Sequence, residues 1–261
     1  MDSYLEFIKS ADIKKGDTVY LISDITKLGI EALSRGERLV MDEVIDLLKD
    51  MIGPEGNLLF PTFTWAFCRG EGFDINATKS KCGSLTETAR KRPDFKRTKH
   101  PIYSFAVWGK DADYLCSLEN ENSWGEGTIF EWLGQVGGKC AMLGLPTLYG
   151  FTGTHHMEQT VGVPYRFHKN FTGPYTDEAG VTSEKTYSMY VRDLDINATA
   201  IKERPIGKIL EQVGAAKVIY YGKVPFSIFR ISDAYEIERM DLSYNKAANM
   251  YTFPNGDPYT E

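Results

Sequence analysis

The sequence predicts an α/β protein, with a three-layer α/β/α sandwich around a mixed, mostly central β-sheet. Apolar, β-branched runs typical of strands alternate with amphipathic helical patterns, and this alternation favours helices packed on a sheet. The alternation does not divide into two clean βαβ halves, so a mixed sheet is expected rather than a fully parallel one.

The individual elements follow from local patterns. Short apolar, β-branched stretches predict strands over 17–23, 57–63, 103–108, 139–145 and 217–221. Apolar residues at helical spacing predict helices over 37–51, 84–92, 111–118, 128–133, 154–160 and 206–213. A half-exposed strand is expected over 184–191, because Thr186, Ser188 and Tyr190 alternate with Tyr187, Met189 and Val191.

The domain organisation is expected to be simple. No linker, charge block, repeat or low-complexity tract interrupts the sequence, which predicts a single domain over 1–261. The stretch 244–261 is rich in turn residues and is expected to form a loosely packed tail.

Composition excludes several classes of function. Thirty Lys and Arg against thirty-six Asp and Glu give a net charge of -6, so nucleic acid is not an expected partner. The longest apolar stretch, 58–67, is interrupted by Pro61 and two threonines and falls short of the ~20 residues that span a membrane. The first residues lack the pattern of a signal peptide, which predicts a cytoplasmic protein. The four cysteines form no C-x-x-C pair and are expected to be reduced thiols.

Common catalytic motifs are missing, but one short helix carries a suggestive pair. The chain has no G-x-G-x-x-G after its first strand, no Walker loop, no G-x-S-x-G and no H-E-x-x-H. His155 and Glu158 are three residues apart and share a helix face, and the helix N-terminus favours a neutral imidazole. The pair could hold a general base, or it could simply sit at the start of an exposed surface helix.

Two further segments are candidates for ligand binding. Residues 97–105 place two cations and a histidine before a proline turn, which suits a phosphate or carboxylate and equally suits a solvated basic turn. Residues 61–65 place hydroxyl and aromatic side chains at the end of a predicted strand, where ligands of open α/β sheets bind. They could line a channel for an amide-bearing chain or pack as an ordinary strand end.

Taken in order, these segments resemble the aminoglycoside 3-N-acetyltransferase (antibiotic N-acetyltransferase) family. The family's Ser-rich loop and Leu-Gly are matched by VYLISDITKLG over 19–29, and its P-T-F-T strand by GNLLFPTFT over 56–64. Its G-x-L-T-E-x-x-R segment is matched over 83–90, and its R-S-x-H-P-x-x-S-F segment over 97–105, with Thr98 in place of Ser. Its T-x-x-H-x-x-E motif is matched over 152–158. The ordered set covers about residues 17 to 235.

The resemblance implies direct transfer of an acyl group, expected to be acetyl, from acyl-CoA to an amine, without a metal. His155 would be the base and Glu158 its partner. CoA would lie along the first loop and the P-T-F-T strand, which nominates Ser23, Asp24, Ile25, Lys27, Leu28, Gly29, Thr62, Phe63 and Thr64. Arg97, His100 and Ser104 would lie beside the same cleft. The acceptor side would include Trp65, Thr154, Tyr165, Arg166 and Lys169. The oxyanion would need a backbone N–H or a hydroxyl such as Thr64 or Thr154.

The acceptor is expected to be an amino sugar, and two versions remain open. The chain has Ile22 where the family's resistance enzymes usually have His, and Ser23-Asp24 where they have Ser-Ser. Arg166 and Lys169 could bind a nucleotide-linked amino sugar used for surface polysaccharide, or could form salt bridges on an exposed turn. The alternative acceptor is an aminoglycoside antibiotic. A metal-dependent hydrolase and an inactive CoA-binding paralogue are more remote alternatives, and a homodimer is one assembly the sequence allows.

Overall fold

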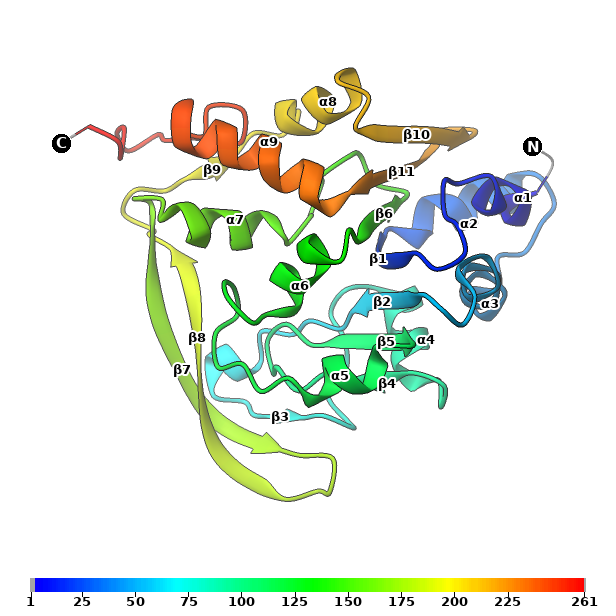
Figure 1. Cartoon of the computed structure of the whole chain (residues 1–261), viewed down its shortest axis with the longest axis horizontal. Helices are drawn as coiled ribbons and strands as arrows, with labels where there is room; N and C mark the ends of the chain where they lie inside the picture. Colours follow the sequence, from blue (N-terminus) through cyan, green and yellow to red (C-terminus); the bar gives the residue numbers. More distant parts are fainter. Residues whose placement is uncertain (1–2, 261) are drawn as a thin grey trace.

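A computed structural model describes residues 3–260 and places a seven-stranded mixed sheet at the centre of the protein (Figure 1). Strand β1 runs parallel to β2 and β6, whereas β5 and β11 run antiparallel to their neighbours. The strand order is β10-β11-β6-β1-β2-β5-β4. The bounds are β1 Thr18–Ser23, β2 Asn57–Pro61, β4 Lys96–Arg97, β5 Phe105–Gly109, β6 Lys139–Leu143, β10 Ala216–Tyr221 and β11 Val224–Arg230.

Helices cover both faces of this sheet, which confirms the predicted three-layer sandwich. Alternation along β1 sends Val19 and Leu21 into one apolar core and Tyr20 and Ile22 into the other. The first core is closed by α1 Tyr4–Lys9, α2 Ile25–Ser34, α3 Met41–Ile52 and α4 Ser84–Lys91. The second is closed by α5 Ala112–Ser117, α6 Ile129–Gln135, α7 Thr154–Val161, α8 Pro205–Gln212 and α9 Ile231–Tyr244.

A long curved hairpin extends from the sandwich beside α7 (Figure 1). It consists of β7 Arg166–Thr176 and β8 Thr182–Arg192, joined on one side by β3 Phe73–Asp74. Most of its residues are exposed, and Arg166 pairs with Arg192 at its base. The strand predicted over 184–191 is therefore present, but it belongs to this separate sheet.

Several elements were not expected from the sequence. The loop predicted after β1 is the ten-residue helix α2, capped by the Asp24 side chain, which accepts a hydrogen bond from the Thr26 amide. Strand β11 contains Pro225, a residue that argues against a central strand; here Pro225 lies just outside the pairing with β6, which begins at Phe226.

The expectation of a loosely packed tail is wrong. Strand β12, Tyr251–Thr252, pairs with β9, Thr199–Ala200. The rings of Tyr251, Phe253 and Tyr259 pack around Tyr165, with centroids 5.4, 5.3 and 6.2 Å away. Aromatic packing therefore fixes this turn-rich segment against the base of the hairpin.

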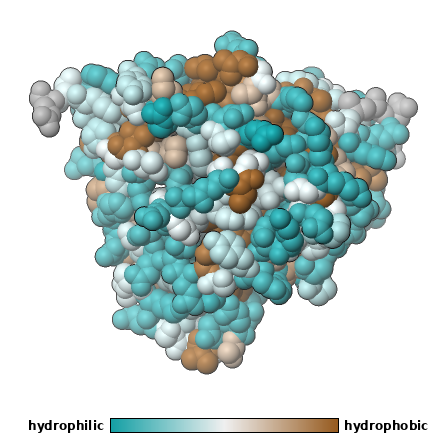
Figure 2. Space-filling model, in the orientation of Figure 1, coloured by the Kyte–Doolittle hydropathy of each residue, from teal (hydrophilic) through white to brown (hydrophobic). Residues whose placement is uncertain are grey.

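The surface is largely hydrophilic on the face shown in Figure 2, with apolar residues in small separate groups. Within residues 3–260, no helix has the length and apolar character needed to cross a bilayer.

Candidate active site

The site lies where parallel strands of the central sheet end. Strands β1, β2 and β6 are neighbours and run the same way, so Ser23, Pro61 and Leu143 end at one edge of the sheet. The segment after β1, the P-T-F-T stretch after β2 and the loop that leads from β6 to α7 all leave from this edge. Ligands of open α/β sheets bind at such an edge.

A buried polar network holds His155 at the start of α7. Its Nδ1 lies 2.5 Å from Oε2 of Glu158, and the Nε of Arg166 lies 2.8 Å from the same oxygen. The Tyr165 hydroxyl donates to Oε1 of Glu158 at 3.1 Å. Glu158 is fully buried, whereas 31% of the His155 side chain is exposed. The Nδ1 edge of the imidazole is therefore held by protein, while part of the ring is exposed.

The electrostatics of this network favour a neutral His155 and a charged Glu158. Desolvation lowers the pKa of His155, the charge of Arg166 lowers it further, and Glu158 opposes both. Burial disfavours the Glu158 carboxylate, but interactions with His155, Arg166 and Tyr251 outweigh it and hold the pKa of Glu158 below its usual value. Two groups compete for Nδ1 of His155: the Glu158 carboxylate at 2.5 Å and Nη2 of Arg166, a donor, at 3.0 Å. We assign the proton to Nδ1 and the lone pair to Nε2, because the contact with the charged acceptor is the shorter of the two.

A cavity of about 320 Å³ opens beside His155. Among the described residues, three charged side chains line this cavity, and all three are arginines: Arg166, Arg192 and Arg204. Its remaining lining residues are Leu148, Gly150, Phe151, Thr152, Thr154, Ala200 and Tyr251. The C-terminal segment, expected to be loose, thus supplies part of the wall through Tyr251.

His156 points away from this arrangement. Its Nδ1 accepts a hydrogen bond from the Gly125 amide at 3.2 Å, and its ring packs 5.2 Å from that of Tyr235. Desolvation lowers its pKa to about 4. His155 and His156 therefore face different surroundings, and no cluster of three or more His, Cys, Asp or Glu suited to a metal ion occurs among residues 3–260.

The residues predicted to hold CoA differ in what they offer a ligand. Thr62, Phe63 and Thr64 are buried, and Ile25 and Leu28 pack into the first core. Among the positions nominated in the first loop, those not buried are Ser23, Asp24, Lys27 and Gly29, at the end of β1 and in the first two turns of α2. These four residues remain the proposed contacts for CoA at the C-terminal end of β1.

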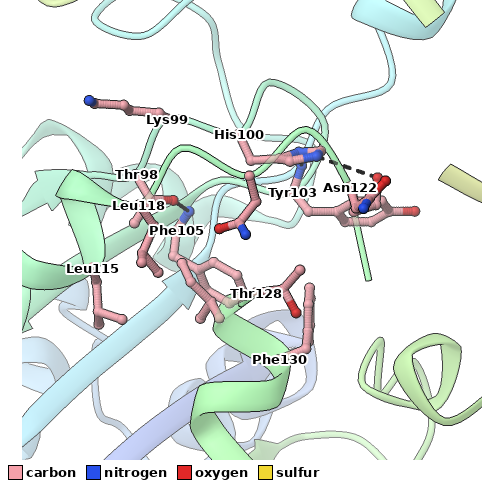
Figure 3. A pocket seen from close by; sticks show the side chains of 13 residues that line it. Thr98, Lys99, His100, Tyr103, Phe105, Leu115, Leu118, Asn122, Thr128 and Phe130 are labelled. Atoms are coloured by element: carbon pink, nitrogen blue, oxygen red, sulfur yellow. Dashed lines mark hydrogen bonds between the residues drawn. The ribbon is translucent and has the colours of Figure 1, made fainter. Parts of the chain in front are cut away.

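Arg97, His100 and Ser104, expected beside the CoA cleft, make hydrogen bonds within the protein, and their part in CoA binding stays a prediction. Arg97 donates to the carbonyls of Thr62, Ile75 and Thr78 and to the Ser104 hydroxyl. Nδ1 of His100 accepts from the amides of Ile102 and Tyr103. The pocket beside His100 is shown in Figure 3 and has a volume of only about 30 Å³, room for one or two waters.

The predicted acceptor residues are also separated by the structure. Thr154 lines the cavity and its hydroxyl lies 2.5 Å from Oε1 of Glu238, but Tyr165 is buried under Glu158. Lys169 is exposed on β7 with Nζ 5.5 Å from the Phe171 ring, and it does not line the cavity. Trp65 is 42% exposed and is likewise outside the lining.

Sequence reasoning missed Arg192, Arg204 and Tyr251. Each stands alone in the sequence, with no motif around it, and each reaches the cavity through long-range packing of β8, α8 or β12. No local signal marks such residues.

Comparisons with known proteins agree with this architecture. A family described as aminoglycoside 3-N-acetyltransferase matches residues 26–242. The SPbeta prophage-derived aminoglycoside N(3')-acetyltransferase-like protein YokD of Bacillus subtilis is 29% identical over 126 residues. That match covers 41% of this chain and spans 46%, less than half, of the relative's own length.

Solved structures resemble the fold over nearly the whole chain. The structure titled "AAC-IIIb binary with CoASH" has a TM-score of 0.78 and 20% identity, and the match covers 92% of this chain and 95% of that one. The crystal structure of YokD from Bacillus subtilis has a TM-score of 0.74 at 21% identity, with 94% and 95% covered. The family match extends over well more than half of the sequence. The chain therefore belongs to the aminoglycoside 3-N-acetyltransferase family.

Proposed function

We propose that this protein is an N-acetyltransferase that transfers the acetyl group of acetyl-CoA directly to an amine of an aminoglycoside. The observation that carries the proposal is the imidazole of His155, held through Nδ1 by the buried Glu158 and open to a cavity. Family membership supports CoA-dependent acetyl transfer, and it favours an aminoglycoside over the nucleotide-linked amino sugar expected from the sequence.

In the proposed reaction, Nε2 of His155 acts on the acceptor amine. A sugar amine is largely protonated at pH 7, and only its neutral form attacks a thioester. The ammonium first loses one proton to water, which leaves the neutral amine. Nε2 then takes a second proton from the nitrogen as the N–C bond forms at the acetyl carbonyl. Collapse of the tetrahedral intermediate breaks the C–S bond, and the departing CoA thiolate takes up the proton. A base of this kind contributes ~10² to 10⁴ in rate.

Direct transfer is favoured over an acyl-enzyme by the state of the cysteines. Burial raises the pKa of Cys68 and of Cys116 to about 11, and it raises the pKa of Cys82 and Cys140 as well. At neutral pH these thiols are protonated and poorly nucleophilic. None of them lines the cavity at His155.

The four cysteines are also free thiols. This supports a cytoplasmic location, where thiols stay reduced and acetyl-CoA is available. A homodimer is a further part of the proposal, and the molar mass in solution by light scattering tests it.

The acceptor is tested by measuring thiol release from acetyl-CoA with a matched panel of amines. Aminoglycosides with a free 3-amino group should give turnover, and the same antibiotics already acetylated there should not. UDP-glucosamine serves as the nucleotide-linked comparison. Turnover with UDP-glucosamine alone would overturn the aminoglycoside assignment while leaving acetyl transfer in place, and no turnover with any amine would overturn the enzyme itself.

A further inference from the structure

The cavity beside His155 has an unusual charge for a protein of net charge -6. Arg166, Arg192 and Arg204 line it, and none of its lining residues in the described range 3–260 carries a carboxylate. An aminoglycoside is a polycation and would be repelled by such a surface. The lining is instead suited to oxygen anions, which guanidinium groups bind through charge-assisted hydrogen bonds.

Within residues 3–260, only one of these arginines forms an ion pair with a carboxylate. Arg166 is paired with Glu158 and also donates to the Tyr190 carbonyl. Within residues 3–260, Arg192 and Arg204 have no carboxylate within ion-pair distance. Among the described residues, the Arg192 side chain makes one hydrogen bond, from Nη1 to the Ala198 carbonyl at 2.8 Å, which satisfies a single donor of five.

Arg204 is held in place without its donors being used. Its guanidinium lies 5.1 Å from the centre of the Tyr149 ring, and its backbone has φ 48°, a left-handed conformation that side-chain-bearing residues seldom adopt. Its Nε is buried and has no hydrogen-bond partner among the described residues. The charge reaches the catalytic centre, since it contributes to lowering the pKa of His155.

We propose that Arg192 and Arg204 form an anion-binding subsite that holds a phosphate or carboxylate group of the ligand bound beside His155. This inference rests on the proposed acetyl transfer, because it assigns one side of that same cavity. Two sources carry the required chemistry: the phosphates of CoA, or an acidic group on the acceptor. In either case the polycationic part of an aminoglycoside is directed away from these arginines.

The subsite is tested by calorimetric binding to the full chain, without turnover. The variants are Arg192→Gln and Arg204→Gln, alone and together, with Arg192→Lys and Arg204→Lys retaining the charge. Arg239→Gln is the matched control, because Arg239 lies on α9 outside the cavity. The probes are CoA, pantetheine, which lacks the phosphates, and UDP-glucosamine.

We expect each Gln variant to weaken binding of the anionic ligand ~10-fold to 100-fold, as for hydrogen bonds to charged groups, and the Lys variants to lose less. Weaker CoA binding with unchanged pantetheine binding supports the subsite and identifies the CoA phosphates as its ligand. Unchanged CoA binding with weaker UDP-glucosamine binding supports it and identifies the acceptor.

Equal binding of all three probes to wild type and to the double Gln variant would overturn the proposal. Thermal melts of each variant establish that it folds. If the Arg204 variants do not fold, the variants of the exposed Arg192 alone decide whether the subsite exists. Because no step needs turnover, the subsite can stand if the proposed reaction fails, and the reaction can stand if the subsite fails.

Discussion

To act as the proposed base, the imidazole of His155 has to be neutral at working pH and fixed in one tautomer. Desolvation and the nearby arginines meet the first requirement by lowering its pKa. Glu158 meets the second by accepting from Nδ1 at 2.5 Å. A buried carboxylate is tolerable here because Arg166 and Tyr165 share its charge and its lone pairs. His155, Glu158 and Tyr165 lie close together in the sequence, and Arg166 follows them at the start of β7. These four residues form the network around the imidazole.

Replacing the base tests this assignment directly. We expect His155→Gln to lower kcat for thiol release by ~10² to 10⁴, because Gln cannot take the proton from the amine. CoA binding should stay within a few-fold. His168→Gln is the control, since His168 is exposed on β7 and absent from the cavity lining. Full activity of His155→Gln would remove the base assignment.

The pH dependence should report the lowered pKa of His155. As pH falls through that pKa the imidazole is protonated and kcat/KM is lost, so the acid limb should lie below pH 6.5. Arg204 contributes to lowering the pKa, so Arg204→Gln should move the limb to higher pH and Arg204→Lys should leave it near the wild-type position. A limb that stays fixed in Arg204→Gln would contradict this electrostatic role.

Among the elements, strands with a continuous apolar run and helices with one apolar face were predictable from sequence. The strands β1, β2 and β6 and the helices α3, α4 and α7 lie within a few residues of their expected bounds. Helix α9 was missed because its buried side includes Glu238 and Asp241, which break the apolar pattern. Strand β7 was missed because most of its side chains are exposed, so burial imposes little alternation.

The buried Glu238 of α9 also affects how the stability of the protein depends on pH. Burial raises the pKa of Glu238 to about 8, with Thr154 donating to one carboxyl oxygen and the other left without a partner. The folded state therefore retains a proton that the unfolded state loses near pH 4.5, and stability should fall as pH rises from there towards 8.

Glu238→Gln should remove that dependence. We expect the variant to gain on the order of a few kcal/mol over wild type at pH 8, and little at pH 5, in urea unfolding. Glu236→Gln on the exposed side of the same helix should change neither value. Equal slopes of stability against pH for Glu238→Gln and wild type would contradict the assignment.

The candidate site was predictable only where its residues lie close together in the chain. His155 and Glu158 could be paired from their spacing on one helix, and Arg166 was noticed because it follows them closely. The role of Arg166 was not predictable, since its contact with Glu158 depends on how β7 leaves α7. Arg192, Arg204 and Tyr251 come from β8, the start of α8 and β12, and only tertiary packing brings them to the cavity.

The junction of α7 and β7 should be sensitive to loss of its ion pair. Arg166→Ala leaves the fully buried Glu158 without its cation, and we expect a loss of ~3 to 5 kcal/mol in the free energy of unfolding. Lys169→Ala, on the exposed part of the same strand, should cost no more than ~0.5 kcal/mol. Equal midpoints in urea for the two variants would show that the pair is not structural.

At the scale of the whole molecule, net charge and local charge have opposite signs. The protein carries a net charge of -6, yet the cavity beside His155 is lined by arginines. Acidic residues lie elsewhere on the protein. Asp42, Asp46 and Asp94, for example, form ion pairs with Arg92 at the surface. Overall charge therefore describes the protein's long-range field and says little about the ligand at a partly enclosed site.

The C-terminal segment should be needed for both stability and activity. A chain ended after Met250 loses β12 and the Tyr251 ring that packs on Tyr165 and lines the cavity. We expect a lower Tm and a fall in kcat of at least ~10-fold. A chain ended after Pro254 keeps β12 and should retain more of both. Wild-type melting and activity in the shorter chain would contradict this role.

The position of Tyr251 also sets the order in which the site can be assembled during synthesis. Ribosomes make the chain from its N-terminus, so α7, the hairpin and the sheet are all complete before β12 exists. Until that last segment is released, the wall it supplies is missing and Tyr165 lacks its aromatic neighbours. A nascent or prematurely terminated chain can therefore hold every motif residue of the family and still lack one wall of the cavity beside His155.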